Sequence, residues 1–155
     1  MRLSELYRSK EDIDISIELF PPKTSEGVSK LLEKVSNLQK LRPSFFSMTY
    51  GAGGSTRQIT LELVDTLKNK VKVEIMCHLT VWGQSKEETR NILNRLQKMG
   101  IYNLIALRGD PPAGHQNLHT AKDGFRHAAD LVAEAGSRNY FSIAVAGFPE
   151  SHPES

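Results

Sequence analysis

The stretch that decides the fold is Tyr102-Asn103-Leu104-Ile105-Ala106-Leu107-Arg108-Gly109-Asp110-Pro111-Pro112. Its apolar first half predicts a buried strand, and a cation, a glycine and a carboxylate follow where that strand ends. In α/β barrels and in open α/β sheets, ligands bind at this end of the strands. The two prolines stop the strand and stiffen the loop that carries the charges. The alternative is a solvated strand-to-helix turn, and the rest of the chain is needed to decide between the two.

The composition is that of an ordinary globular domain. The 155 residues suffice for one domain with a buried core, and 39% of them are hydrophobic and 25% charged. The formal net charge of +2 argues against nucleic-acid or membrane partners. The first residues lack a signal-peptide pattern, and no apolar run approaches the roughly 20 residues that span a bilayer. The one cysteine, Cys77, lies in an apolar run, so we interpret it as a buried structural thiol in a cytoplasmic protein rather than as a nucleophile.

The chain repeats a strand, a charged or glycine-rich loop and an amphipathic helix. We expect strands at residues 14–20, 45–49, 71–79, 102–107 and 141–147, and helices at residues 28–41, 59–67, 85–100 and 122–135. This alternation predicts an α/β fold with parallel strands, either a (β/α) barrel or a doubly wound sheet. No Gly-x-Gly-x-x-Gly motif follows the first strand, which weakens the dinucleotide-fold option. A barrel needs eight such units in about 250 residues, so this chain is expected to be truncated, with about five strands and four helices of a barrel.

Every expected strand ends on residues that could carry chemistry. They are Glu18, Thr49, His78 with Thr80, Arg108 with Asp110, and Phe148 with Glu150 and His152. Because the carboxyl ends of parallel strands meet at one end of a barrel, we expect these side chains to form one pocket. Glu18 lies between Ile17 and Leu19, which predicts a desolvated carboxyl with a raised pKa that can act as a general acid. The alternative for Glu18 is an internal ion pair with Arg108.

The remaining candidates carry alternatives of their own. His78 follows an apolar run, so a buried, hydrogen-bonded core histidine competes with a functional role. The glycine-rich loop at residues 51–55 lacks the lysine and the spacing of a P-loop, and we interpret it as a flexible turn. His115 and His119 lie in a polar loop and are expected to be solvated, and no set of histidines and carboxylates has the spacing of metal ligands. Trp82 lines a pocket for a flat ligand or covers the barrel rim. These residues alone indicate a site for a polar heteroaromatic ligand.

Five segments, collinear and at successive strand ends, resemble the methylenetetrahydrofolate reductase family. They are Ile17-Glu18-Leu19-Phe20-Pro21-Pro22-Lys23-Thr24, Ser47-Met48-Thr49-Tyr50-Gly51-Ala52, His78-Leu79-Thr80, Ala106-Leu107-Arg108-Gly109-Asp110-Pro111-Pro112 and Phe148-Pro149-Glu150-Ser151-His152-Pro153-Glu154. The resemblance implies a TIM-type barrel that binds FAD and an oxidoreductase of one-carbon metabolism and methionine biosynthesis. Such an enzyme reduces 5,10-methylenetetrahydrofolate to 5-methyltetrahydrofolate, and NADH or NADPH and the folate take turns at one face of the flavin.

The resemblance also implies roles for individual residues. Glu18 matches the general acid that helps the folate ring open to an iminium ion, and Asp110 matches the carboxylate beside the flavin, where a fixed negative charge stabilises that cation. The positions that match cofactor-binding residues are Thr49, His78, Arg108, Gly109, Asp110, His127, Ala128, Phe148 and His152, and no metal is implied. Two of these depart from the family pattern, because Phe148 stands where tyrosine is common and His127-Ala128 stands where Tyr-Ala is common.

The resemblance makes residues 1–155 the N-terminal part of a single FAD-binding (β/α)8 barrel catalytic domain. The later strands, with further contacts to FAD, folate and nicotinamide, have no counterpart in the sequence. An incomplete barrel exposes a sheet edge, so we expect a homo-oligomer or completion by a missing C-terminal portion. Two alternatives stay open: a truncated, non-catalytic fragment that binds flavin weakly or not at all, and a flavin-free barrel enzyme that acts on a pterin-like ligand.

Overall fold

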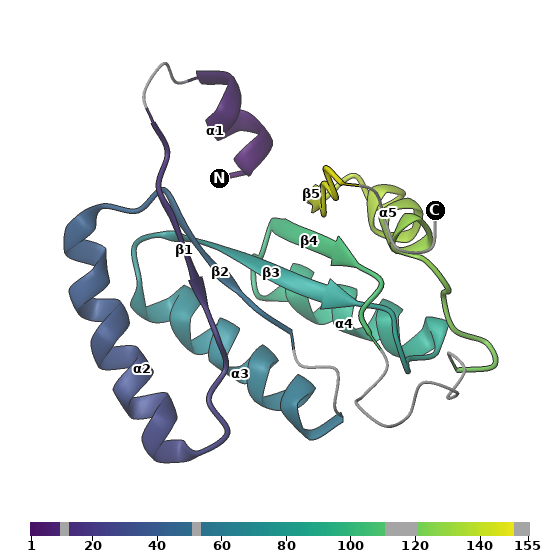
Figure 1. The fold of residues 1–155 in the computed structure, drawn as a ribbon, viewed down its shortest axis with the longest axis horizontal. Coiled ribbons are helices and arrows are strands. Elements are labelled where there is room, and N and C mark those ends of the chain that lie inside the picture. Colours follow the sequence, from purple (N-terminus) through teal and green to yellow (C-terminus); the bar gives the residue numbers. More distant parts are fainter. Residues whose placement is uncertain (10–12, 51–53, 111–120, 151–155) are drawn as a thin grey trace.

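The computed structural model describes residues 1–9, 13–50, 54–110 and 121–150. Its centre is a sheet of five parallel strands, β1 to β5, which lie side by side in the order of the chain (Figure 1). Their bounds are Ser16–Leu19, Phe45–Met48, Glu74–Thr80, Asn103–Leu107 and Ser142–Val145. Every crossover moves one strand further in the same direction, as in a barrel, whereas a doubly wound sheet reverses its order at a switch point. The predicted TIM-type α/β barrel is confirmed as the fold class, and the described residues form a five-stranded part of it.

Five α-helices accompany the strands in the described part of the chain. They are α1 (Leu3–Ser9), α2 (Ser25–Leu38), α3 (Gly54–Lys70), α4 (Lys86–Lys98) and α5 (Ala128–Gly136), and a short 3-10 helix, η1 (Gln39–Leu41), follows α2. Helices α2, α3 and α4 gather on one face of the sheet (Figure 1). Buried strand residues such as Phe46, Ile75 and Leu104 form the core with helix residues such as Val64 and Leu93. This apolar layer packs against one face of the sheet, and the three helices leave the opposite face uncovered.

Most predicted boundaries differ from the observed ones by a few residues, and two of the differences have a clear cause in local contacts. The fourth helix was expected at residues 122–135, but α5 begins only at Ala128. The carboxylate of Asp130 accepts hydrogen bonds from the backbone N–H groups of Arg126 and His127, each at 2.9 Å, and His127 has an extended backbone. The third strand was expected from residue 71, but β3 begins at Glu74 because the chain there still closes the end of α3. Side-chain capping, rather than apolar spacing, decides the first of these boundaries.

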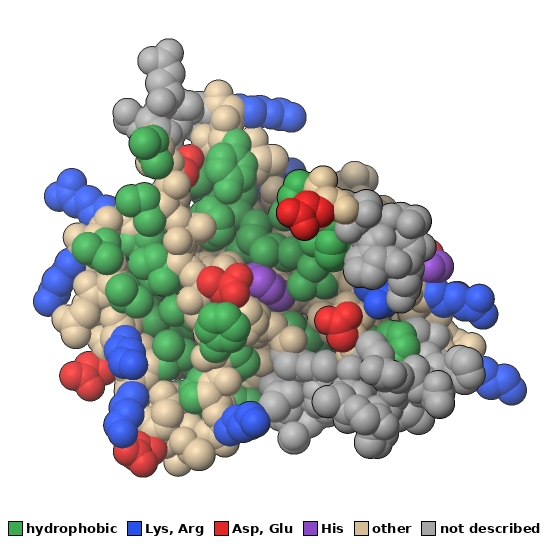
Figure 2. Space-filling view, in the orientation of Figure 1, with side chains coloured by type: hydrophobic (Ala, Val, Ile, Leu, Met, Phe, Trp, Pro, Cys, Tyr) green, Lys and Arg blue, Asp and Glu red, His purple; other side chains and the backbone are tan. Residues whose placement is uncertain are grey.

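Side chains alternate between the two faces of the sheet. Ile17 and Leu19 pack against the helix layer, so Glu18, which lies between them, faces the opposite side. The pairing register places one residue of each strand in a single row on that side: Glu18, Ser47, Met76, Asn103 and Ser142. We call this side the inner face, because it is the one that a barrel closes around. Acidic and histidine side chains lie among hydrophobic ones in the space-filling view (Figure 2).

Helix α1, which the sequence does not predict, covers the N-terminal end of the strands and lies apart from α2, α3 and α4 (Figure 1). Its two buried apolar residues, Leu3 and Leu6, pack against Phe45 and Met76 of the inner face. Two apolar positions in a seven-residue helix give too weak a period to be recognised in the sequence. The inner face is therefore closed at this end by a segment from the start of the chain.

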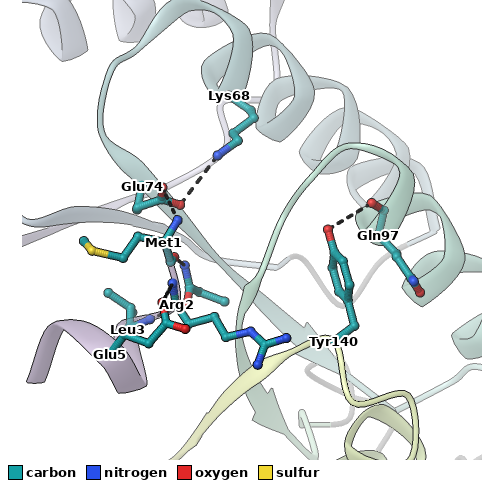
Figure 3. Close-up of polar contacts among 9 residues, drawn as sticks. Met1, Arg2, Leu3, Glu5, Lys68, Glu74, Gln97 and Tyr140 are labelled. Carbon is teal, nitrogen blue, oxygen red and sulfur yellow. Dashed lines mark hydrogen bonds and ion pairs between the residues drawn. The ribbon is translucent and has the colours of Figure 1, made fainter. Parts of the chain in front are cut away.

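Polar contacts tie α1 to the strands. The fully buried side chain of Asn103 accepts a hydrogen bond from the backbone N–H of Leu3 at 2.8 Å and donates one to the carbonyl of Met1 at 3.1 Å. The terminal ammonium group of Met1 lies 2.6 Å from the Glu74 carboxylate, which Lys68 also approaches at 3.5 Å (Figure 3). Both polar groups of the buried amide of Asn103 are satisfied, as a stable interior requires.

Candidate functional site

The turn Arg108-Gly109-Asp110 stands at the C-terminal end of β4 and is held by the neighbouring loop. Gly109 has a φ of +81°, and a Cβ at this position would lie 2.9 Å from the Cβ of Thr80. Only glycine meets both the left-handed backbone and the close approach. The carbonyl of Arg108 accepts hydrogen bonds from the backbone N–H groups of Val81, at 3.2 Å, and Trp82, at 2.9 Å. The charged side chains of Arg108 and Asp110 therefore lie on a turn that backbone hydrogen bonds and close packing hold in place.

A cavity of about 510 Å³ opens beside this turn, between the ends of β4 and β5 and the start of α5. Six of the predicted cofactor-binding residues line it: Arg108, Gly109, Asp110, His127, Ala128 and Phe148. The rest of its lining consists of small and apolar residues from the same elements, namely Ala106, Leu107, Ala129, Val145 and Ala146. Sequence reasoning missed these five, because an apolar residue at a strand end has no chemical signature; their only signal was adjacency to the predicted ones.

Two opposite charges lie at the cavity. The guanidinium Nη2 of Arg108 lies 3.8 Å from Oδ1 of Asp110, whose side chain is 93% exposed. An ion pair with one partner so exposed contributes little to stability. Ala128 and Ala129 form the first turn of α5 at the cavity wall, and a helix N-terminus carries a partial positive charge. A negatively charged group in the cavity would meet both Arg108 and this helix end.

Helix α5 begins where it does because of a charged cap. Hydrogen bonds from the backbone of His127 and then of Arg126 stabilise the ionised form of Asp130 and lower its pKa below the ordinary value.

The backbone of Phe148 has a φ of +42°, an uncommon conformation for a residue other than glycine. Its side chain is half exposed at the cavity. The last described turn of the chain thus brings an aromatic ring to the mouth of the cavity.

Glu18 and His78 form a second group, on the inner face and outside the lining of this cavity. Oε2 of Glu18 lies 3.8 Å from Nε2 of His78. Burial lowers the pKa of His78, and the nearby Glu18 carboxylate opposes that shift in part. Nε2 of His78 is buried and has no hydrogen-bond partner in the structure. His78 is therefore buried, as one of its two interpretations required, but this ring nitrogen is not hydrogen-bonded.

The predicted environment of Glu18 is wrong. Its side chain is 49% exposed rather than desolvated, and the charged partner that it approaches is His78 rather than Arg108. The physical reason is the strand period: Ile17 and Leu19 point to the helix layer and bury themselves there, whereas Glu18 points to the inner face. Apolar neighbours in the sequence of a strand do not desolvate the residue between them.

Several other predicted residues can now be placed. Thr49 follows β2 and is partly buried, and it does not line the cavity; Trp82 is partly buried beside Gly109. Cys77 is fully buried, and burial raises the pKa of its thiol to about 12, which fits the predicted structural thiol. His152, His115, His119, Gly51, Ala52, Gly53, Pro111 and Pro112 lie outside the described residues.

Two buried polar side chains near the turn, Gln84 and Thr80, have surroundings that the sequence does not predict. The side-chain amide of Gln84 donates to the carbonyl of Thr80 at 2.5 Å, while its own Oε1 and the hydroxyl of Thr80 are buried without a hydrogen-bond partner.

Among the described residues, no group of three or more His, Cys, Asp or Glu side chains is arranged to hold a metal ion. Within the same ranges, no helix combines the length and the apolar character needed to cross a membrane.

Comparison with known proteins points to one family. The family described as methylenetetrahydrofolate reductase matches residues 2–155. The chain is 44% identical over 141 residues to methylenetetrahydrofolate reductase (NADH) 1 of Zea mays, covering 90% of this chain and 24% of that protein. It is 37% identical over 144 residues to 5,10-methylenetetrahydrofolate reductase of Pectobacterium carotovorum, covering 92% and 46%, respectively. It is 36% identical over 146 residues to methylenetetrahydrofolate reductase 1 of Schizosaccharomyces pombe, covering 92% and 24%. The chain thus spans between a quarter and a half of the length of these relatives.

Proposed function

The chain belongs to the methylenetetrahydrofolate reductase family, and on this premise we propose that it forms the FAD-binding N-terminal part of a single (β/α)8 barrel catalytic domain. The proposed reaction is the reduction of 5,10-methylenetetrahydrofolate to 5-methyltetrahydrofolate with NADH or NADPH, in one-carbon metabolism and methionine biosynthesis. One observation carries the proposal: Arg108, Gly109, Asp110, His127, Ala128 and Phe148, which come from three separate segments, line one cavity.

The residues around the cavity fit FAD. Its volume of about 510 Å³ lies within the range of about 300–1,000 Å³ that is typical of small-molecule sites. Leu107, Val145 and Phe148 offer an apolar wall for a flat ring system, and Arg108 with the start of α5 offers positive charge for phosphate groups. When bound, FAD would supply the hydride chemistry that no side chain of this chain can supply. Thr49 and His78 on the inner face, together with His152, are proposed as further contacts.

Two carboxylates have proposed roles in catalysis. Asp110 is largely exposed at the cavity, where its negative charge would stabilise a cation that develops on the substrate. Glu18 lies on the inner face, half exposed, where a substrate can reach its Oε2. As the general acid, Glu18 would give its proton to the folate nitrogen that leaves when the five-membered ring opens. The positions differ in strand and in environment, which suits two carboxylates with different tasks.

The first test is FAD binding by the 155-residue chain. We expect the fluorescence of added FAD to be quenched on binding, and Arg108→Met to weaken binding about 10-fold or more, because a hydrogen bond to a charged group contributes about 1.5–3 kcal/mol. Arg90→Met is the matched control, since Arg90 lies on α4, pairs with Glu134 and does not line the cavity. Equal affinities for the two variants would contradict the proposed cofactor site.

A second test addresses the reaction. In a longer polypeptide that contains the whole barrel, Glu18→Gln should abolish folate reduction and leave the transfer from NADH to flavin intact. Only folate reduction needs the acid, because the acid protonates the folate nitrogen that leaves. Equal losses in both half-reactions would show that Glu18 is not the general acid. Asp110→Asn is the companion variant, since the same loss of charge at the cavity tests the second carboxylate.

An alternative function is a non-catalytic fragment that binds flavin weakly or not at all. The observation in its favour is the open sheet: within the described residues β1 pairs only with β2 and β5 only with β4, and large apolar side chains beside these edges, including Ile15, Phe20 and Val145, are exposed. Weak or absent flavin binding together with no menadione-linked NADH oxidation would favour this alternative. A flavin-free enzyme acting on a pterin-like ligand predicts colourless protein.

The same open edges lead us to propose partners. A sheet edge with exposed apolar residues favours pairing with another strand, so we propose homo-oligomers or completion by a C-terminal portion. The exposed apolar side chains of Ile15 and Phe20 beside β1 and of Val145 in β5 would be covered in either assembly. A single, buried cysteine suits a reducing compartment, and we propose the cytoplasm.

A further inference from the structure

The pair Glu18–His78 joins two strands that are not neighbours. Glu18 belongs to β1 and His78 to β3, and β2 lies between them in the sheet. The two side chains meet across the inner face, with Oε2 and Nε2 3.8 Å apart. This distance is too long for a hydrogen bond, but it is short enough for an electrostatic interaction between the two side chains. The approach is therefore built into the sheet and does not depend on a flexible loop.

The two members of the pair have opposite surroundings. His78 is 8% exposed, whereas the side chain of Glu18 is 49% exposed. Nε2 of His78 is buried without a hydrogen-bond partner in the structure, and the polar atom beside it is Oε2 of Glu18. A buried polar atom without a hydrogen-bond partner lowers the stability of the fold, so its presence in a native structure indicates a functional reason. Glu18 is thus the accessible member of the pair, and His78 is the enclosed one.

The charged groups at the ends of the neighbouring strands pair with partners other than His78. Arg108, at the end of β4, lies 3.8 Å from Asp110. Glu74, at the opposite end of β3, lies between the Met1 ammonium group and Lys68. Of the charged groups on the described elements, Glu18 is the one whose charge acts on His78. The electrostatics of the imidazole therefore depend on burial and on one carboxylate.

We propose that Glu18 and His78 share one proton, with Nε2 of His78 taking it up and passing it to Oε2 of Glu18. In this step the Nε2–H bond breaks and the Oε2–H bond forms, so an imidazolium–carboxylate pair becomes a neutral imidazole and a carboxylic acid. After Glu18 has given its proton to substrate, its exposed carboxylate takes the next proton from water and Nε2 of His78, which is enclosed, holds it until the next turnover. The inference rests on the proposed function, in which Glu18 is the acid, and makes His78 the positioning residue that supplies it.

The chemistry favours this direction of transfer. Burial disfavours the charged form of the His78 imidazole, and the accessible acceptor beside its Nε2 is Oε2 of Glu18. Groups coupled this closely titrate as a pair rather than one by one.

The experiment is a pH titration of the 155-residue chain by NMR, without flavin or folate, following the carboxyl carbon of Glu18 and the imidazole signals of His78. We expect the Glu18 signal to shift in two steps, one of which coincides with the titration of His78. In Glu18→Gln the midpoint of His78 should fall, because the carboxylate that favours its charged form is lost. Glu33→Gln, which removes an exposed carboxylate from α2, is the matched control and should leave this midpoint unchanged.

One independent step for each residue, with the same His78 midpoint in wild type and Glu18→Gln, would overturn the proposal. The wild-type titration needs no variant, so it decides the question even where a substitution disturbs folding. Glu18→Asp, which keeps the charge and shortens the side chain, should lower the His78 midpoint less than Glu18→Gln. Because FAD is absent, a failed coupling is distinguishable from a failed cofactor site, which the FAD titration reports separately.

Discussion

The two ends of the sheet treat buried polar groups differently. At the N-terminal end of the strands, both groups of the Asn103 amide are hydrogen-bonded to α1. At the C-terminal end, the hydroxyl of Thr80, Nε2 of His78 and Oε1 of Gln84 are buried without hydrogen-bond partners in the structure. A glycine held against Thr80 and an open cavity lie at the same end. The N-terminal end is thus covered by α1 with its buried amide hydrogen-bonded, whereas the C-terminal end has buried polar groups without hydrogen-bond partners and an open cavity.

This difference teaches how a parallel sheet divides its work. All strands run the same way, so their starts meet at one end and their charged turns at the other. Satisfied polar groups at the strand starts stabilise the fold, and unsatisfied ones at the strand ends reduce stability. Natural proteins accept such a reduction where a ligand or a reaction needs the groups. Substitutions that remove a buried polar group should therefore have opposite effects on stability at the two ends.

The largest effect is expected from Asn103→Leu, which breaks the closed end. Leucine has a similar volume but leaves the N–H of Leu3 and the carbonyl of Met1 without the partners that Asn103 provides. Removing one side of buried hydrogen bonds should lower the free energy of unfolding by about 3 kcal/mol. Urea denaturation followed by circular dichroism measures this change. A loss below about 1 kcal/mol would show that α1 contributes little to the fold.

The next effect tests the rigid turn at the open end. Gly109→Ala should lower the free energy of unfolding by about 2–3 kcal/mol, because it combines a positive φ with a Cβ 2.9 Å from Thr80. Gly100→Ala separates the two causes, since Gly100 also has a positive φ, of +73°, but an added Cβ there meets no described atom within 4 Å. Its loss should be about 1 kcal/mol. Equal losses in the two variants, measured by urea denaturation, would mean that the approach to Thr80 is not tight.

A smaller effect of opposite sign is expected from Thr80→Val. Valine keeps the shape of threonine and removes a buried hydroxyl without a hydrogen-bond partner, so the free energy of unfolding should stay the same or rise by up to about 1 kcal/mol. The same urea titration measures it. The comparison of the two ends fails if Thr80→Val is as destabilising as Asn103→Leu, since Thr80 would then have a stabilising partner.

The sequence predicted what depends on repeated pattern. Alternating strands and amphipathic helices each extend over many residues, and a parallel α/β fold followed from them, whereas the choice of a barrel came from the family resemblance. The start of α5 depends on a single carboxylate, Asp130, and α1 depends on a hydrogen-bonded pairing with Asn103 more than 90 residues away. Neither leaves a periodic signal. The turn at Gly109 was recognisable because charge and glycine follow an apolar run directly.

The site was predicted less completely than the fold, for a related reason. Residue types at strand ends identified Arg108, Asp110 and Phe148, and the family resemblance added Gly109, His127 and Ala128. Neither identified the apolar residues that complete the cavity wall. The environment of Glu18 depends on which face it occupies and on what lies across that face, and its neighbours in the chain give no information on either. His78 was recognised, but its approach to Glu18 across β2 required the structure.

The smallest effect expected is on the pH dependence of stability and concerns His78. Burial lowers its pKa in the folded chain below the ordinary value of 6.5, so the unfolded chain binds a proton first as the pH falls. The stability that a neutral His78 contributes is present above pH 6.5 and is lost as the pH falls below it. In Glu88 and Asp130, where hydrogen bonds lower the pKa of a carboxyl, the corresponding loss begins below their ordinary values of 4.5 and 3.8, outside this window.

Urea denaturation at pH 7, 6 and 5 should therefore show a smaller decline in His78→Gln than in wild type. Parallel curves for His78→Gln and wild type would mean that the imidazole of His78 takes up its proton as easily in the folded chain as in the unfolded one. The open end of the sheet would then hold no titratable group at the expense of stability, and its contrast with the closed end would reduce to Thr80 and Gln84.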